Sequence, residues 1–142
     1  MVMERTPRVK GILETALHVS DMKRSMEFYQ SLFGFEPMQF NERFCAFAVP
    51  GPQVLLLFLK DGSREPVNMP EGTIPPHDGA GRLHFAFSIA EADLQSWEEW
   101  LKEKGVGIES KVKWEEGGTS IYFRDPDEHL VELATPGCWP NY

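Results

Sequence analysis

Two histidines and one glutamate stand out in this sequence because each has apolar neighbours on both sides within a strand-like run: His18, His84 and Glu132. An imidazole or carboxylate buried there without a partner loses several kcal/mol of hydration, and one divalent cation would compensate all three groups. Two imidazoles and one carboxylate leave coordination positions open for a substrate, and this donor set suits Fe, Mn, Zn or Ni. The sequence therefore predicts a single metal site, against the alternative of buried residues satisfied by hydrogen bonds.

The elements that would carry these residues occur twice in the same order. The apolar pattern first predicts a strand, a helix and three strands, at 10–20, 21–34, 36–40, 43–49 and 53–60. The same order then returns at 82–89, 91–104, 108–114, 119–124 and 129–134. Each predicted ligand histidine lies on the first strand of its copy, so the repeat is the main organisational feature of the chain.

We therefore predict an α+β fold in which two βαβββ modules form a curled mixed sheet around a metal cavity. With 142 residues, 42% of them hydrophobic, the chain is expected to be one domain, with module one at about 10–60 and module two at about 82–136. Strand alternation places mostly small residues beside the ligands: Ala16, Ser20, Ala86, Ser88 and Ala134. Such a face leaves room for a cavity, although small residues also permit close sheet packing.

The segment 61–81 between the modules is rich in Gly and Pro and is expected to be a connector or a mobile lid without regular structure. His77 lies in it and would enter the site only if this connector folds over the metal. His129 falls on the strand face opposite Glu132, so we expect a structural histidine there.

Tyr122 and Arg124 share one face of the strand at 119–124. Tyr122 is the candidate catalytic residue, through a hydrogen bond to a substrate oxygen, and Arg124 is the candidate that binds a substrate anion. The alternative is a partly exposed aromatic residue and a solvated arginine at a sheet edge.

Composition excludes several function classes. A net charge of -8, with 22 acidic and 14 basic residues, disfavours nucleic acid as a partner. The N-terminal residues lack an apolar signal region and no apolar run is long enough for a membrane span, so we expect no membrane association. Cys45 and Cys138 lack metal-binding spacing and are expected to be reduced thiols in a cytoplasmic protein.

The paired modules and the closing run from Ser120 to Leu133 resemble the vicinal oxygen chelate superfamily, which includes glyoxalase, bleomycin-resistance and extradiol-dioxygenase proteins. The resemblance covers about residues 10–136. It implies a metal that chelates two vicinal oxygens of a small-molecule substrate, with His18, His84 and Glu132 at the ligand positions. Members such as glyoxalase I have a further carboxylate on the last strand of the first module, where Leu56 or Leu57 is expected here, which weighs against that reaction.

The resemblance implies two reaction classes with three ligands. Ring-cleaving dioxygenase chemistry is narrowly favoured, with fosfomycin-type epoxide opening or isomerisation as the alternative and a non-catalytic, bleomycin-resistance-like binder as the third candidate. Tyr122 suits both enzyme classes, and His77 is the nearest candidate for the base of a dioxygenase. Glu128 stands where the family turn commonly has Gly. Modules in this family pair within a chain or across two chains, and we expect a homodimer because sheet edges need covering.

Overall fold

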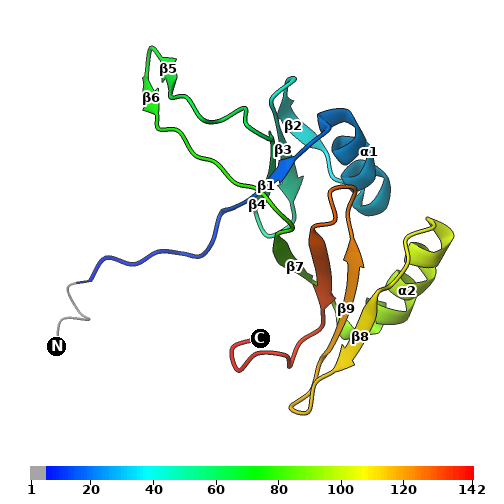
Figure 1. Ribbon diagram of the computed structural model, residues 1–142. Coiled ribbons are helices and arrows are strands. Elements are labelled where there is room, and N and C mark those ends of the chain that lie inside the picture. Colours follow the sequence, from blue (N-terminus) through cyan, green and yellow to red (C-terminus); the bar gives the residue numbers. More distant parts are fainter. Residues whose placement is uncertain (1–5) are drawn as a thin grey trace.

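The computed structural model describes residues 6–142 and contains the predicted strand–helix–three-strand unit twice (Figure 1). Module one consists of β1 (Glu14–Val19), α1 (Met22–Phe33), β2 (Pro37–Phe40), β3 (Phe44–Val49) and β4 (Gln53–Leu59). Module two consists of β7 (His84–Ser88), the 3₁₀ helix η2 (Glu91–Asp93), α2 (Leu94–Glu103), β8 (Ser110–Lys113), β9 (Thr119–Arg124) and β10 (Leu130–Ala134). The predicted α+β class and the duplicated module are confirmed.

Each module forms its own four-stranded mixed sheet, and the two sheets have the same topology. The strand orders are β1-β4-β3-β2 and β7-β10-β9-β8, with the first strand of each module parallel to the last. Within residues 6–142, no strand ladder joins one sheet to the other. The contact between modules is therefore made by side chains and turns.

The ends of α1 follow from two residues that the sequence marks. Asp21 caps the N-terminus, where its carboxylate accepts a hydrogen bond from the backbone N–H of Arg24 at 3.0 Å. Gly34 ends the helix with φ 68°, and its N–H donates to the Gln30 carbonyl at 2.9 Å. A residue with a side chain is strained in that left-handed conformation, so glycine stops the helix at this point.

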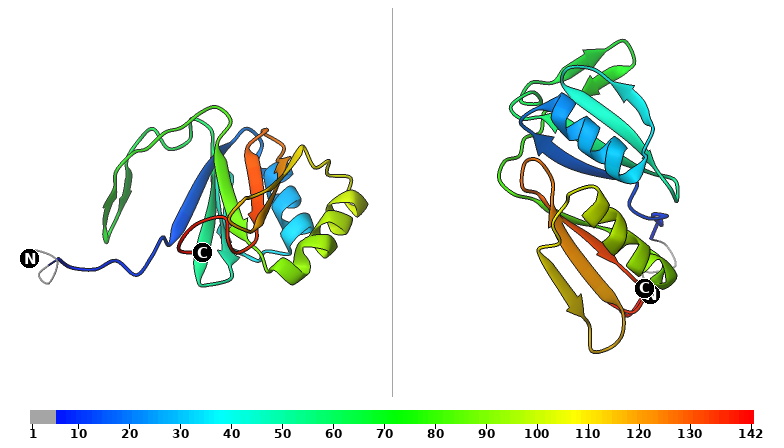
Figure 2. Two further views of the ribbon diagram at one scale, coloured as in Figure 1. Left: turned by 90° about the horizontal axis from the view of Figure 1, so that it is seen from below. Right: turned by 90° about the vertical axis from the view of Figure 1, so that its right-hand side faces the viewer.

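Both helices lie on one side of the strands (Figure 2). Tyr29 of α1 packs in one apolar cluster with Leu17, and Leu101 of α2 packs in the other with Ile121, so the helices cover the bulky strand faces. The Trp100 indole N–H on α2 donates to the Leu32 carbonyl on α1 at 2.8 Å and so links the two helices. Leu101 of α2 is fully buried, and the other fully buried aliphatic residues come from four strands: Leu17, Val19, Leu55, Leu57, Ile121, Val131 and Leu133. Burial of this apolar surface holds the modules together and leaves the opposite sheet faces for other contacts.

The segment between the modules differs from the prediction because it contains a short hairpin, β5 (Val67–Met69) and β6 (Gly72–Ile74). A hydrogen bond from the Thr73 hydroxyl to the Asn68 side-chain oxygen at 2.8 Å supports the pairing. Short strands of this kind are set by local pairing rather than by an alternating apolar pattern, which explains why the sequence did not reveal them.

The hairpin projects from the body of the molecule on the side opposite the helices, and the N-terminal arm extends on the same side (Figure 2). Large apolar side chains on both segments are exposed: Val9, Ile12, Leu13, Val67, Met69 and Ile74. None of the helices in the described part of the chain is long and apolar enough to cross a membrane.

Candidate metal centre

His84 and Glu132 face each other across neighbouring strands of module two. The strand register pairs His84 with Leu130, two residues before Glu132, and this brings His84 Nε2 to 3.2 Å from Glu132 Oε1. His84 Nδ1 lies 2.9 Å from the Leu130 carbonyl oxygen. Nδ1 therefore carries the hydrogen and donates it to that carbonyl, which leaves the Nε2 lone pair directed at a carboxylate oxygen.

Two acceptor atoms at this distance repel each other unless a cation or a proton lies between them. With metal–ligand bonds of about 2.0–2.2 Å, adjacent ligand atoms at right angles are about 3 Å apart. A backbone carbonyl that holds the second ring nitrogen of a ligand histidine is the usual support for such a site. The spacing and orientation of this pair therefore fit a bound divalent metal.

A buried hydroxyl orients the second carboxylate oxygen of the pair. Ser120 Oγ donates to Glu132 Oε2 at 2.6 Å, and it accepts a hydrogen bond from Trp114 Nε1 at 2.8 Å. Ser120 is fully buried, so Glu132 keeps this geometry in the folded protein. Sequence analysis did not include Trp114 in the site. In the β8–β9 pairing the residue across from Ser120 is Val112, and Trp114 lies two residues further along, where its backbone N–H donates to the Gly118 carbonyl at 3.0 Å.

Tyr122 lies directly opposite Glu132 in the β9–β10 pairing, and its ring centre is 6.2 Å from that of His84. Burial raises the pKa of the Tyr122 hydroxyl, and the nearby Glu132 carboxylate raises it further. The phenol therefore keeps its proton at neutral pH and can donate a hydrogen bond next to the His84–Glu132 pair. Its catalytic role remains a prediction.

Arg124 is already engaged by other groups. Its Nε and Nη2 donate to the two carboxylate oxygens of Glu109, each at 3.0 Å, and its Nη1 donates to the Glu128 carbonyl at 3.0 Å. The Glu109 carboxylate raises the pKa of Arg124 and the guanidinium lowers the pKa of Glu109. Binding a substrate anion, as predicted from the sequence, would require Arg124 to exchange this fork-like contact for another.

His18 lies away from the pair, and within residues 6–142 no group of three His, Cys, Asp or Glu side chains could hold a metal ion. The ring of His18 packs against His77 and Phe58, with ring centres 5.6 and 5.9 Å apart. Its Nε2 is buried and has no hydrogen-bond partner. Burial lowers the pKa of His18, and the neighbouring His77 lowers it further, so the neutral form required of a metal ligand is favoured.

The connector between the modules packs directly on the His18 ring. At Gly79 a side chain is excluded, since a Cβ there would be 2.6 Å from His18 Nδ1. The connector is fixed at its base by a hydrogen bond from His77 N–H to the Ser63 carbonyl at 2.9 Å and by an Arg64–Asp78 ion pair at 3.1 Å. His77 is thus brought beside His18, as the folded-over connector would require, and not beside His84.

These residues fit a metal, but one chain brings only two of them together. Two imidazoles and a carboxylate are suitable ligands for a divalent metal, and His84 Nε2 and Glu132 Oε1 already point toward each other. His18 Nε2 is a buried polar atom without a hydrogen-bond partner.

The expected position of a further carboxylate ligand is corrected by the strand register. In module two Glu132 is two residues beyond the partner of His84, and in module one the partner of His18 is Phe58. The counterpart of Glu132 is therefore Lys60, just after β4, and not Leu56 or Leu57. An ammonium group cannot coordinate a cation, so the conclusion that the site has three protein ligands is unchanged.

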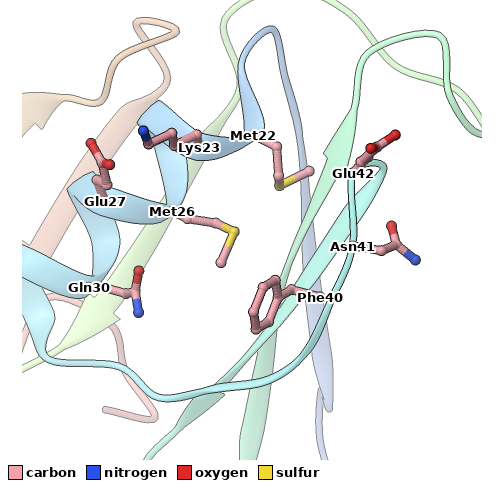
Figure 3. Close-up of a pocket in the computed structure, with 8 residues that line it drawn as sticks. All are labelled: Met22, Lys23, Met26, Glu27, Gln30, Phe40, Asn41 and Glu42. Atoms are coloured by element: carbon pink, nitrogen blue, oxygen red, sulfur yellow. The ribbon is translucent and has the colours of Figure 1, made fainter.

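A separate groove of about 610 Å³ opens between α1 and the end of β2 (Figure 3). Met22, Met26 and Phe40 point into it, and polar side chains such as Gln30 and Asn41 surround them. It contains none of the predicted ligands, so it is distinct from the candidate metal centre.

Two βαβββ modules with a histidine on each first strand and a glutamate on the closing strand define the class of metal-chelating proteins that the sequence resembles. The chain belongs to the Glyoxalase/Bleomycin resistance protein/Dioxygenase superfamily, whose profile matches residues 11–133. This confirms the resemblance to the vicinal oxygen chelate proteins.

Two curated relatives share a name that specifies a reaction. The chain is 33% identical to the metallothiol transferase FosB of Shouchella clausii over 129 residues, which cover 89% of this chain and 81% of the relative. It is 32% identical to FosB of Staphylococcus haemolyticus over 128 residues, covering 89% and 84%.

Solved structures show the same architecture. Lactoylglutathione lyase from Agrobacterium tumefaciens superimposes with a TM-score of 0.84 and 30% identity, covering 94% of this chain and 99% of the other. The fosfomycin resistance protein FosX from Listeria monocytogenes gives a TM-score of 0.67 at 23% identity, covering 92% and 97%, which establishes a shared fold. The relatives named for a reaction are thus transferases and a lyase. These names do not support the narrow preference for dioxygenase chemistry, and the metallothiol transferases favour the transferase alternative.

Proposed function

We propose that this protein is a metal-dependent transferase that opens a small epoxide by adding a thiol. The observation that carries the proposal is the His84 Nε2–Glu132 Oε1 distance of 3.2 Å. Hydrogen bonds from His84 Nδ1 to the Leu130 carbonyl and from Ser120 to Glu132 Oε2 fix both side chains in an orientation that suits a metal. The 33% identity to a metallothiol transferase supports this reaction in preference to ring cleavage.

The bound metal would supply Lewis acidity to the epoxide oxygen. The thiol loses its proton and its sulfur forms a bond to an epoxide carbon as the carbon–oxygen bond breaks. The released oxygen takes up a proton, so that the product is a hydroxy thioether. Tyr122, with its raised pKa, retains its hydrogen and donates a hydrogen bond to the oxygen that becomes negative.

The third ligand, His18, is proposed to come from a second copy of the chain. Two observations support this arrangement: His18 Nε2 has no hydrogen-bond partner, and the described residues of one chain gather no three-ligand group. The connector that covers the His18 ring would move aside as the second chain brings its metal-binding pair to Nε2. In addition, the exposed apolar side chains of the hairpin and the N-terminal arm need a surface to cover them. A two-fold dimer would use each His18 once and complete two equivalent sites.

The reaction can be tested with protein loaded separately with Mn(II), Fe(II), Zn(II) and Ni(II). Each form is incubated with fosfomycin and with cysteine or glutathione, and the thioether is measured by mass spectrometry. We expect product with wild-type protein and none with H84A, whereas E99Q, on the exposed face of α2, serves as the unaffected control. Wild-type protein that binds no divalent metal, or that forms no adduct from any thiol, contradicts the proposal.

A second candidate reaction is supported by the 30% identity and the TM-score of 0.84 to lactoylglutathione lyase. Lys60 occupies the position of the further carboxylate, which ranks this reaction lower. The same preparations are therefore offered the glutathione hemithioacetal of methylglyoxal, and oxygen uptake is measured with catechols. Lactoylglutathione formation without epoxide opening would reverse the ranking, and ligand-dependent thermal stabilisation without any turnover would identify a binder.

A further inference from the structure

The turn between β9 and β10 makes several of the polar contacts between module two and module one. Asp125 accepts a hydrogen bond from the buried Tyr29 hydroxyl of α1 at 2.7 Å. Asp127 accepts from the backbone N–H of Ser20 at 3.1 Å and from its hydroxyl at 2.5 Å. Alternate residues of the run that carries the family resemblance therefore make contacts between the modules.

His129 completes this set, and its ring uses both nitrogens. Nδ1 accepts the backbone N–H of Leu83 at 2.8 Å, and Nε2 lies 2.7 Å from the carbonyl oxygen of His18. Because Nδ1 accepts, Nε2 carries the hydrogen and donates it to that carbonyl. The side chain is only 1% exposed, so no water competes for either bond.

Both partners of the ring belong to the backbone of the proposed metal ligands or of their immediate neighbours. The carbonyl is that of His18 itself, and Leu83 directly precedes His84 in the chain. The Leu83 carbonyl also accepts the N–H of Leu130, whose own carbonyl holds the His84 ring. One imidazole thus connects the strand that presents His18 to the strand that presents His84.

We propose that His129 is a positioning residue that fixes β1 against β7 and so sets where the two ligand histidines lie. The inference rests on the metal site of the proposed function. In a two-fold dimer, the position of His18 relative to its own module two decides how it meets the partner's metal-binding pair. Displacing β1 by a fraction of an ångström would therefore loosen both sites.

Two variants each break one of the two bonds. In H129N the amide oxygen occupies the place of Nδ1 and keeps the Leu83 contact, but the side chain is too short to reach the His18 carbonyl. In H129Q the amide nitrogen extends to the place of Nε2, and the acceptor for Leu83 is lost. Whichever of the two folds, as judged by circular dichroism and size, is sufficient for the test.

Y29F is the matched control because it removes one buried hydrogen bond from the same contact between modules without touching either ligand strand. Full-length protein is titrated with Co(II), and the dissociation constant and visible spectrum of the bound ion are recorded. We expect the His129 variants to bind Co(II) about 10- to 100-fold more weakly, with an altered spectrum, while Y29F binds as wild type does.

Wild-type affinity and spectrum in a folded His129 variant would overturn the inference while leaving the proposed function intact. Equal weakening in Y29F would also overturn it, since the effect would then follow general stability. A wild-type protein that binds no Co(II) would instead remove the metal site and this inference together.

Discussion

At the scale of single residues, the candidate site depends on which atoms are left without a hydrogen. His84 Nδ1 donates its hydrogen to the Leu130 carbonyl, and Ser120 Oγ donates its hydrogen to Glu132 Oε2. His84 Nε2 and Glu132 Oε1 therefore face each other as two hydrogen-bond acceptors. Two acceptors held at this distance repel each other unless a cation or a proton lies between them. Tyr122 is the contrasting residue, because its raised pKa keeps a hydrogen available beside that cation.

Replacing Tyr122 with phenylalanine therefore removes a donor and leaves the ligands in place. In the proposed thiol transfer we expect kcat to fall by about 100-fold, with metal content unchanged. Steady-state kinetics and metal analysis of the same preparation provide the measurement. Unchanged turnover would show that Tyr122 only fills space.

A second prediction at this scale concerns stability at alkaline pH. Burial and the adjacent Asp125 carboxylate raise the pKa of Tyr29 well above its usual value. Because the folded-state pKa is the higher one, the stabilisation is fully present below about pH 10, the unfolded pKa, and is lost as pH rises through the folded pKa. Burial raises the pKa of the Cys45 thiol to about 11, which acts in the same direction.

We expect the free energy of unfolding to decrease from about pH 9, the ordinary pKa of the Cys45 thiol, and to fall more steeply above about pH 10 in the wild-type protein than in Y29F. At pH 7, Y29F should be less stable by about 1–3 kcal/mol because Asp125 loses a buried donor. Urea denaturation from pH 7 to 11 measures both effects, and parallel pH profiles for the two proteins would argue against this origin.

At the scale of elements, the β9–β10 turn stores backbone strain. Glu128 has φ 64° there, the left-handed conformation that a family glycine at this position would adopt without strain. Its side chain is mostly exposed, and its nearest ionic partner, Arg82, is 3.9 Å away. The side chain therefore offers little to offset the strain.

E128G should consequently stabilise the protein by roughly 0.5–1 kcal/mol, the strain relieved minus the added flexibility of glycine in the unfolded chain. E128A is the control, since alanine removes the carboxylate but keeps the strain. Thermal and urea unfolding would distinguish them. An equal gain in both variants would assign the effect to the carboxylate.

At the scale of the whole molecule, the proposed site is shared between two chains. If His18 of one chain joins His84 and Glu132 of the other, a dimer of one H18A chain and one H84A chain contains one doubly altered site and one intact site. Random mixing makes half of the dimers mixed, so about a quarter of wild-type activity should return.

The experiment is to unfold and refold an equimolar mixture of H18A and H84A, each inactive alone, and to measure thiol transfer. H84A mixed with E132Q is the control, because both changes lie in the same half of the site and no mixed dimer contains an intact one. No recovery in the H18A and H84A mixture would indicate that each chain completes its own site.

Local pattern in the sequence was sufficient for the helices and strands of the two modules, but not for the β5–β6 hairpin. Asp21 and Gly34 mark the ends of α1 because a side-chain cap and a left-handed φ are properties of single residues. The period of two along strands placed Tyr122, Ser120 and Glu132 on one face, because alternation is built into the extended backbone. At Glu128 the positive φ fits the expectation, implied by the resemblance and not by a local pattern, that this turn commonly has Gly.

Only the tertiary structure decided what depends on register and on contacts between distant segments. The counterpart of Glu132 is Lys60 because strand pairing, not residue count, aligns the modules. His129 was expected to be structural, but its two partners, 46 and 111 residues away in the chain, could not be read from a local pattern. His18, His84 and Glu132 all have side chains that can bind a metal ion, so the sequence grouped them. Within the described residues of one chain, packing places His18 away from the other two.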